Sequence, residues 1–504
     1  MIPDLNMIKI LNAQQIKLLD VNTIAQEPIL SINLMERACH AFVTWFMEKF
    51  DTTYTIGIVC GTGNNGGDGL GIARLLSEWG YSVNVWIVRG SAKQTEDFKR
   101  NLSRITDKIE TFEITTEADQ GLFTNCSVII DAIFGSGLSR PPEGIYAQAI
   151  NCINKTKAIC IAVDVPSGLM IDSHSVEPSV KADYTVTFQL PKLSFLLPEN
   201  HAHVGKWHAV DIGLSKSFLK EVETNHFLIT AKAVKKKLKQ LSKFDHKGKN
   251  GKALLIAGSY GKMGACILAA RGCMRSGVGL LTLLVPRSGN VIVQTAVPEA
   301  MTLSDKSETH FTGGIDLSGF DVIGIGPGIG TESQTSNAFK EVIELARPMV
   351  IDADGLNMLA ANPELLTQIP SGSILTPHPK EFERLAGSWK NDFERLEKQC
   401  QLSSKTKAII ILKGAHTSIA TPDGKVYFNS SGNPGMAKGG SGDVLTGVLT
   451  GLLAQQYSAL DAAILGVFAH GLAGDLAARD RGMHALIASD LIEFLPQAFK
   501  SLSS

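Results

Sequence analysis

Apolar runs alternate with amphipathic stretches along most of the chain, beginning near residue 54. Helical patterns lie at 70–79 and 145–154, and two more precede the first apolar run, at 13–24 and 33–49. Strands separated by helices pair in parallel, with helices on both faces of the sheet. The first half is therefore predicted to be a three-layer α/β domain with these strands: Tyr54–Cys60, Ser82–Val88, Ser127–Ile133, Ala158–Val163 and Tyr184–Phe188.

The pattern breaks between residues 213 and 250 and then resumes. The break holds ten lysines, eight of them between residues 232 and 249, and few aromatic residues, which is more typical of a solvated helix near a domain boundary than of a nucleic-acid patch. A second α/β pattern starts with the apolar run Ala253–Ala257 and continues to the C-terminus. We therefore predict two domains, residues 1–225 and 226–504.

The composition of the chain favours small molecules as ligands over nucleic acid or membranes. The 504 residues carry a formal net charge of −1, so no charge imbalance draws the protein to nucleic acid or to an anionic membrane. No cysteine pair forms a C-x-x-C motif, and several of the eight cysteines sit in apolar runs, which is typical of buried free thiols. With no apparent signal peptide and no apolar run near the roughly 20 residues of a membrane span, we expect a cytoplasmic protein that binds small molecules.

Three glycine-containing loops with an aspartate follow predicted strands in the first half. Gly61–Gly66 fits G-x-G-x-x-G, but the next strand ends without an acid for the ribose hydroxyls, and Asp68 would repel a pyrophosphate, so a hydride-transfer domain is disfavoured. The other two loops are 131–141 and 164–169. Single loops of this kind are often strand-to-helix caps, but three of them at the carboxyl ends of parallel strands predict one ligand crevice. Carboxylate, amide and hydroxyl oxygens there would suit a hard cation.

The runs GTGNNGGDGL, DAIFGSGLSRPPEG and VDVPSGL together resemble the epimerase domain of the NAD(P)H-hydrate repair enzymes, over about residues 10–212. The resemblance implies a Rossmann-like domain that holds a potassium ion through Asn65, Asp131 and Ser167. It also implies that the substrate contacts Asn64, Asn65, Gly66, Gly67, Asp68, Gly135, Ser136, Gly137, Leu138, Ser139, Arg140, Pro141, Tyr146 and Asp164.

Epimerisation breaks and remakes a bond at the hydrated ring carbon, so it calls for an acid/base group. Asp164, at a strand end in the crevice, is the candidate. Lys192 is a weaker second candidate that could be a surface charge. The closely spaced His201, His203 and His208 are interpreted as part of a structural hairpin rather than a metal site.

The motif that indicates nucleotide binding in the second half lies near the C-terminus, in the turn AKGGSGDVL. A glycine-rich turn that opens an apolar helix, here Val444–Leu453, directs free amides and a positive dipole end at an anion. Asp443 at the helix start could be an N-cap, or it could be the base that deprotonates a hydroxyl attacking phosphate. Gly324–Gly330 follows an expected strand at Phe320–Ile323, and His378 and Lys413 follow two further strands, although either His378 or His416 alone would more often be an ordinary histidine.

These motifs, with AGSYGKMGACILAARGCMRSGVGLLT, VIDADGLN, ILTPHPKEF, LKGAHTSIATPDG and GNPGMAKGGSGDVL, resemble the ribokinase-like dehydratase domain of the same repair enzymes, over about residues 245–500. The resemblance implies that the hydrated cofactor contacts Ala265, Gly328, His378 and Asp443. It implies nucleotide contacts from Lys413, Gly414, Ala415, His416, Thr417 and Gly442. Lys438 departs from the family's frequent Thr and would add a cation beside the phosphates.

The resemblance predicts a bifunctional enzyme that epimerises NADHX and NADPHX and dehydrates the S form with ADP or ATP and magnesium, ADP being expected. Asp443 would activate the hydroxyl of the hydrate for phosphoryl transfer. The family also implies a homo-oligomer. Two alternatives stay open: a small-molecule kinase of the ribokinase-like type, which leaves the first half without a role, and a non-catalytic nucleotide sensor or scaffold.

Overall fold

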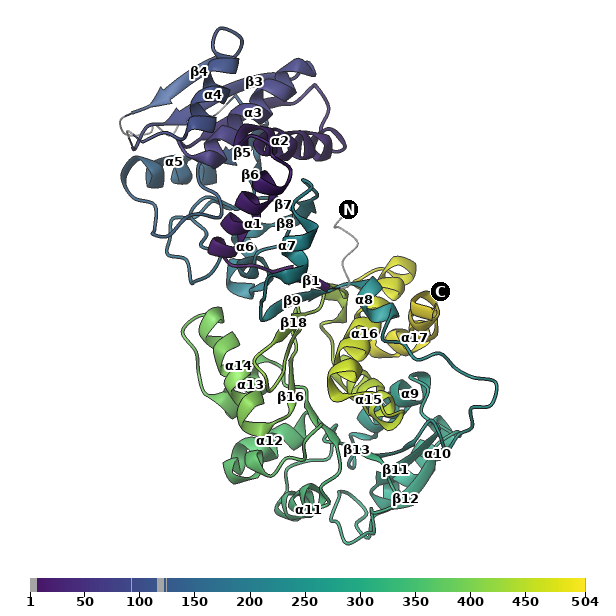
Figure 1. Cartoon of the computed structure of the whole chain (residues 1–504). Helices are drawn as coiled ribbons and strands as arrows, with labels where there is room; N and C mark the ends of the chain where they lie inside the picture. The colour runs from purple at the N-terminus through teal and green to yellow at the C-terminus, as the bar shows by residue number, and fades with distance from the viewer. Residues whose placement is uncertain (1–6, 92, 116–121, 124, 504) are drawn as a thin grey trace. The chain divides into compact units, whose positions relative to one another are not determined.

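The computed structural model describes residues 7–91, 93–115, 122–123 and 125–503. The chain forms two compact units, the first made mainly of Lys9–Thr224 and the second mainly of Asn225–Lys390 and the residues from Glu394 on. Each unit has its own sheet and hydrophobic core (Figure 1).

The first unit is built on a seven-stranded sheet in the order β4-β3-β2-β5-β6-β7-β8, and every neighbouring pair is parallel. Its strands are β2 (Thr55–Cys60), β3 (Ser82–Val88), β4 (Glu110–Ile114), β5 (Val128–Ala132), β6 (Ile159–Val163), β7 (Tyr184–Phe188) and β8 (Lys206–Val210). Its helices are α1 (Ala13–Gln26), α2 (Ser31–Met47), α3 (Asn64–Glu78), α4 (Glu96–Ile105), α5 (Gly144–Lys155), α6 (His201–Val204) and α7 (Lys216–Glu221).

Helices cover both faces of this sheet. On one face Phe42 of α2, Leu70 of α3 and Phe98 of α4 are fully buried against the strands, and on the other Ile150 and Ile153 of α5 pack on the sheet. The predicted three-layer parallel architecture is confirmed. The interpretation of His201, His203 and His208 as a hairpin is wrong, because short helix α6 separates β7 from β8 and the two strands are parallel.

The second unit is built on an eleven-stranded sheet in the order β1-β9-β18-β17-β16-β15-β14-β13-β10-β11-β12. Strands β16, β17 and β18 are joined by antiparallel pairing, whereas the strands from β16 to β12 are parallel. The strands are β1 (Met7–Ile10), β9 (His226–Ile229), β10 (Lys252–Ile256), β11 (Leu280–Val285), β12 (Met301–Ser304), β13 (Val322–Ile325), β14 (Met349–Ile351), β15 (Ile374–Leu375), β16 (Ile409–Leu412), β17 (Ser418–Ala420) and β18 (Val426–Phe428).

The helices of the second unit also form two layers. Those on one face include α9, α15, α16 and α17, and those on the other include α11, α12 and α13 (Figure 1). The helices are α8 (Ala231–Lys235), α9 (Met263–Arg275), α10 (Asn290–Ala296), α11 (Ser333–Glu344), α12 (Asp354–Ala361), α13 (Pro379–Ala386), α14 (Asp392–Thr406), α15 (Ser441–Ala454), α16 (Ala459–Arg481) and α17 (Ala488–Ser503).

Three differences from the prediction concern the candidate loops and the domain boundary. Helix α3 begins at Asn64, so the asparagine-glycine segment is its first turn and not a preceding loop. The strand expected at Phe320–Ile323 is β13 at Val322–Ile325, which places Gly324 inside the sheet. The lysine-rich segment contains strand β9 and the short helices α7 and α8 instead of one solvated helix.

Helix α16 is the one described helix whose length and apolar composition would suit a membrane span, which the sequence analysis did not expect. It lies in the core of the second unit, where residues such as Ile464, Val467 and Phe468 pack in the main hydrophobic cluster. A core helix therefore accounts for this apolar run.

Candidate functional site

The three glycine-containing loops of the first unit lie side by side. They follow β2, β5 and β6, and these strands are neighbours in the parallel sheet. Gly66 packs against the carbonyl oxygen of Gly61 so closely that a β-carbon would overlap it. The turn therefore needs glycine at this position, and it places Asn64–Asp68 at the carboxyl edge of the sheet.

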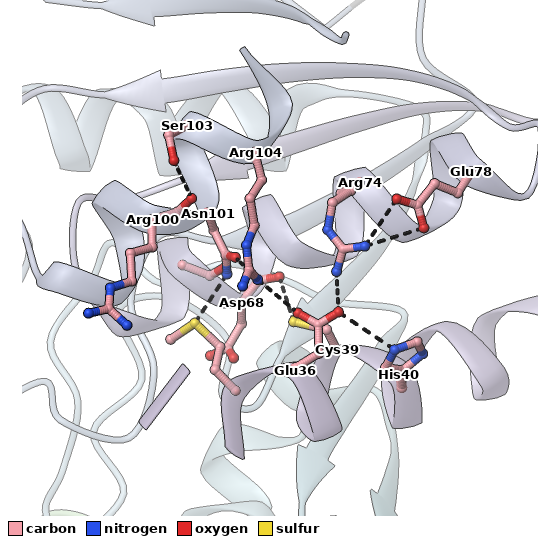
Figure 2. A network of polar contacts seen from close by, with 12 residues as sticks. Glu36, Cys39, His40, Asp68, Arg74, Glu78, Arg100, Asn101, Ser103 and Arg104 are labelled. Atoms are coloured by element: carbon pink, nitrogen blue, oxygen red, sulfur yellow. Dashed lines mark hydrogen bonds and ion pairs between the residues drawn. The ribbon is translucent and has the colours of Figure 1, made fainter. Parts of the chain in front are cut away.

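Two side chains from other helices hold the backbone of this turn (Figure 2). Asn101 of α4, which is 1% exposed, donates from Nδ2 to the carbonyl oxygen of Gly67 at 2.9 Å. The Cys39 thiol of α2 lies 3.4 Å from the carbonyl oxygen of Asp68. The sequence analysis did not find Asn101, because no pattern links an isolated asparagine to a turn 34 residues away.

Ion pairs extend this network towards solvent. Glu36 of α2 pairs with Arg74 and, at 3.2 Å, with Arg104, and the Arg104 guanidinium donates to Asn101 Oδ1 at 3.0 Å. Glu36 therefore ties α2 to α3 and α4, the helices that carry the turn and Asn101. Because these groups are partly exposed, their main effect is to fix geometry rather than to add stability.

The three residues predicted to hold potassium lie in the first turn of α3 (Asn65), at the end of β5 (Asp131) and in the loop after β6 (Ser167). The Asp131 carboxylate accepts from the Ser167 backbone N–H at 2.7 Å and from its hydroxyl at 2.6 Å. Burial raises the pKa of Asp131 to about 6, partly offset by these hydrogen bonds. Asn65 contacts Gly135, and its buried Nδ2 has no hydrogen-bond partner in the described part of the chain.

Asp164 and Lys192 form a buried ion pair beside these loops. Lys192 Nζ lies 2.7 Å from Asp164 Oδ1 and 2.7 Å from Thr187 Oγ1, and the lysine is 1% exposed. The reading of Lys192 as a surface charge is therefore wrong. Burial alone would raise the pKa of Asp164, but the Lys192 ammonium and three hydrogen bonds outweigh it and lower the pKa. Asp164 is thus a carboxylate at neutral pH.

Asp68 has the opposite electrostatic environment. Burial, followed by repulsion from Asp164 and Asp20, raises the pKa of Asp68 well above its ordinary value. Burial and Asp164 also raise the pKa of Asp20 of α1 to about 6. Neighbouring carboxyls whose pKa values are driven apart are a signature of acid/base chemistry. The structure therefore adds Asp20, which sequence analysis missed, to the group around Asp164.

The remaining predicted residues of the first unit lie between β5 and α5. Residues 135–141 form a partly exposed loop, containing Gly135, Ser136, Gly137, Leu138, Ser139, Arg140 and Pro141. Tyr146, on the first turn of α5, packs its ring on Phe134 with centroids 4.8 Å apart. The structure places this loop beside Asn65, and the individual substrate contacts stay predictions.

In the second unit, the first turn of α15 is the candidate anion-binding site. Its N-cap is Gly440, in the left-handed region at φ 92°, and no side chain caps the helix. The turn therefore directs free N–H groups away from the helix. Asp443 lies in the first turn, three residues beyond Gly440, so it is not the N-cap. Burial and then Asp352 raise the pKa of Asp443 to about 7, against the opposing effect of Lys413.

Lys413 lies directly against this turn. A β-carbon on Gly442 would be 3.3 Å from Lys413 Nζ, and Nζ pairs with Asp352 Oδ1 at 2.9 Å. Burial opposes the charge of Lys413, but Asp352 and Glu381 outweigh it and raise the lysine pKa. Asp352 lies in the run VIDADGLN, but no role for it was predicted from the sequence.

The loops after β10, β13 and β14 lie next to one another at the carboxyl edge of the second sheet. A β-carbon on Gly328, at φ 64°, would lie 3.2 Å from Ala265 Cβ, so these two predicted substrate contacts are adjacent. The Ser259 hydroxyl donates to the Gly328 carbonyl oxygen at 2.8 Å. Ala353, between two aspartates, has φ 48° and ψ −117°, a backbone conformation that favours glycine.

The remaining predicted nucleotide and substrate residues have local partners. His378 caps α13, with its Nδ1 accepting from the N–H groups of Lys380 and Glu381. Residues 414–417 form a turn closed by Thr417 Oγ1 and the backbone of Gly414, and this turn contains Gly414, Ala415, His416 and Thr417. Lys438 donates to the carbonyl oxygen of His484 at 2.6 Å.

Two protein-family models match the chain, one in each unit. Residues 31–194 match the family described as YjeF-related protein N-terminus. Residues 253–497 match the family described as NAD(P)H-hydrate dehydratase. The two matched segments contain the predicted residues of the first and second site, respectively.

Full-length relatives have both halves. A bifunctional NAD(P)H-hydrate repair enzyme from Moorella thermoacetica is 38% identical over 94% of this chain and 93% of its own length. An enzyme of the same name from Thermofilum pendens is 36% identical over 98% of this chain and 97% of its own. A solved ribokinase-like superfamily protein from Enterococcus faecalis is 26% identical, with a TM-score of 0.51, over 56% of this chain and 99% of its own. The last match confirms the predicted ribokinase-like fold of the second unit.

Proposed function

Because this chain belongs to the family of bifunctional NAD(P)H-hydrate repair enzymes, we propose that the first unit epimerises the hydrated cofactor at the Asp164 site and that the second unit dehydrates it at the Asp443 site. The observation that carries the proposal is the pairing of two acid/base sites in one chain. One has a carboxylate held ionised by Lys192, and the other has a carboxyl with a pKa of about 7 beside an open helix N-terminus.

Epimerisation needs a bond to the hydrated ring carbon to break and re-form. Lys192 lowers the pKa of Asp164, which favours a carboxylate that can accept a proton, whereas burial raises the pKa of Asp68 and favours the protonated form that can donate one. Asp164 directly follows β6 and Asp68 lies near the start of α3, so both groups are at the carboxyl edge of the sheet. We assign Asp164 as the base and Asp68 as its complementary acid, with the substrate between the turn at the start of α3 and the 135–141 loop.

A potassium ion fits the neighbouring oxygen cluster. Asp131 is fully buried, and the partners recorded for its carboxylate in the described chain are N–H and O–H donors, so a cation would offset its desolvation. Asn65 and Ser167 would supply the amide and hydroxyl oxygens. The ion would neutralise the buried carboxylate and fix the three loops relative to one another.

Dehydration needs a better leaving group than hydroxide. Asp443 accepts the proton of the hydrate hydroxyl as that oxygen attacks the terminal phosphoryl group of ADP or ATP. The rest of the nucleotide leaves as AMP or ADP, respectively. Phosphate then departs from the ring carbon while the neighbouring ring carbon loses a proton, which restores the reduced nicotinamide. Lys413 and the free amides of α15 stabilise the transferring charge. Magnesium bound to the nucleotide would supply further neutralisation of that charge.

The decisive experiment measures recovery of reduced-nicotinamide absorbance from a mixture of both NADHX epimers, with ADP, ATP or neither. We expect full recovery with one nucleotide and none without it. The Asp164→Asn chain should stall near half recovery under conditions of slow spontaneous epimerisation, and Asp443→Asn should give none.

Three results would contradict the proposal. The first is no recovery with either nucleotide. The second is unchanged turnover by Asp443→Asn. The third is a stable phosphorylated product without absorbance recovery, which would instead indicate a small-molecule kinase.

A further inference from the structure

Two buried carboxylates without an assigned role enclose Lys413 in the second unit. Asp352 directly follows β14 and is 2% exposed, and Glu381 lies in the first turn of α13 and is 6% exposed. Lys413 Nζ lies 2.9 Å from Asp352 Oδ1 and 3.9 Å from Glu381 Oε2. The lysine that touches the anion-binding turn is thus held from two sides.

Each carboxylate also accepts a hydrogen bond from a second group. Glu381 Oε2 accepts from the backbone N–H of His378 at 2.8 Å. Asp352 Oδ2 accepts from the Thr446 hydroxyl at 2.8 Å, and this hydroxyl oxygen lies 3.1 Å from the carbonyl oxygen of Gly442. A continuous set of contacts therefore runs from a candidate substrate residue, through Lys413, to the turn that carries Asp443.

Stability alone is a poor reason for this arrangement. Desolvating two carboxylates and an ammonium group costs several kcal/mol per ion, so a buried ion pair is often no more stabilising than an apolar pair of equal volume. What the arrangement does provide is a fixed position for the Lys413 ammonium. Held by Asp352 and Glu381, its ammonium is confined beside Gly442, which has no side chain to separate it from the turn.

We propose that Asp352 and Glu381 are positioning residues of the dehydratase: they fix the Lys413 ammonium at the phosphate-binding end of α15, and Asp352 also fixes, through Thr446, the helical turn that carries Asp443. This inference deepens the proposed function and rests on it. Neither carboxylate needs to touch the substrate for this role.

Several charged groups lie around the turn that carries Asp443. Asp352 follows β14, Asp354 begins α12 and Lys413 follows β16, and all three act on Asp443, whereas Glu381 of α13 acts on Lys413. Lys262, at the start of α9, lies 3.8 Å from Asp354 Oδ2, and His470 of α16 contacts the Ser441 carbonyl oxygen at 3.0 Å. Burial lowers the pKa of His470 to about 4, so this histidine is neutral near pH 7.

Asp352 and Lys413 act on Asp443 in opposite directions. Asp352 raises the pKa of Asp443, and Lys413 lowers it. Asp352→Asn should therefore move the acid limb of the kcat–pH profile to lower pH while it slows the reaction. Lys413→Met should move the same limb to higher pH. A residue that only supports folding would lower thermal stability without moving the limb.

The test uses the full chain, NADHX of the S form and the nucleotide that supports wild-type turnover. Asp352→Asn, Glu381→Gln and Thr446→Val should each lower kcat by roughly tenfold to a hundredfold, because misplaced groups lose transition-state contacts. Thr446→Ser keeps the hydroxyl and should stay near wild type. Asp423→Asn is the matched control, because Asp423 pairs with Lys425 at 2.6 Å at the surface of the same unit.

An active wild type with unchanged kcat and pH profile in Asp352→Asn would overturn the inference and leave the proposed function intact. Equal losses in Thr446→Val and Thr446→Ser would also overturn it, and this pair decides the question if Asp352→Asn does not fold. A wild type inactive with both nucleotides would instead overturn the proposed function, and the inference with it.

Discussion

At the scale of single residues, Asp443 shows how a site can reduce the stability of its own fold. Its pKa is raised from 3.8 to about 7 in the folded chain, so the folded state binds a proton that the unfolded state has lost. Ionisation of Asp443 therefore lowers the free energy of unfolding. This loss is absent below about pH 4, grows as pH rises and reaches its full size above about pH 7. The ionised form that the reaction needs is therefore the form that the fold disfavours.

We predict that Asp443→Asn is more stable than wild type at pH 8 and that this advantage is smaller at pH 5. Asparagine has the shape of the carboxyl group without its charge, so the penalty disappears. Urea denaturation at both pH values, followed by circular dichroism, measures the two differences. An advantage that does not grow with pH would contradict the assigned pKa.

Lys192 supplies a second residue-scale prediction. Lys192→Met leaves the buried Asp164 carboxylate unpaired and should destabilise the first unit by roughly 3–5 kcal/mol at pH 7. Asp164→Asn should also destabilise, because it leaves the ammonium unpaired. The double variant should be more stable than the sum of the two losses predicts. Strict additivity in a double-mutant cycle, measured by denaturant unfolding, would refute the pairing.

The sequence predicted some of these residues and not others, for a physical reason. Asp164 follows a recognisable strand and Asp443 lies at the start of a recognisable helix, and these patterns are enough to place both residues at a sheet edge. Lys192, Asp352 and Asn101 owe their roles to burial and to partners 28, 61 and 34 residues away, respectively. No local pattern encodes such contacts.

At the scale of elements, helices α9 and α15 pack with their backbones in contact. A β-carbon on Gly447 would overlap the carbonyl oxygen of Ala269, and one on Gly272 would lie 2.6 Å from that of Val444. Both helices begin at the candidate site, α9 near Ala265 and α15 near Asp443. Their separation therefore sets the distance between predicted substrate contacts.

Gly447→Ala should push α15 away from α9. We predict a loss of stability of roughly 1–3 kcal/mol from overpacking and a larger fractional loss of dehydration than of epimerisation. Gly319→Ala is the control, since a β-carbon there meets nothing within 4 Å. Thermal unfolding and the two activity assays on each variant test this, and equal behaviour of the two variants would count against it.

Apolar runs predicted β2, β3, β5, β6 and β7, whereas β4 and β8 and several glycine-rich or very short elements were not predicted. The first turn of α3 contains Gly66 and Gly67, so it has no apolar repeat that predicts a helix. Strand β15 has only two residues, and β17 and β18 have three each, too few for alternation to be visible. These short strands form because neighbouring strands pair with them, and not because of a pattern in their own sequences.

At the scale of the whole molecule, the two-domain organisation was predictable because each half has its own motifs and its own apolar pattern. Each unit has a separate sheet and core, so each reaction has a complete scaffold. We predict that Asp164→Asn and Asp443→Asn chains complement each other in trans. The mixture should recover the absorbance of both epimers, whereas each variant alone should not.

The complementation assay mixes equal amounts of the two variants with both epimers and nucleotide. Recovery that stalls near half in the mixture would contradict independent sites that exchange the hydrate through solution. Wild type at the same total site concentration is the reference for the rate.

Ala353 adds a consequence for how this sequence can change over time. Its φ of 48° lies in a region where glycine is favoured, and the residue stands between Asp352 and Asp354. Ala353→Gly should relieve this strain and raise the free energy of unfolding by about 1 kcal/mol, measurable in urea. It should also slow dehydration, because a freer backbone holds Asp352 less firmly. Selection for catalysis and selection for stability then act in opposite directions on a single methyl group.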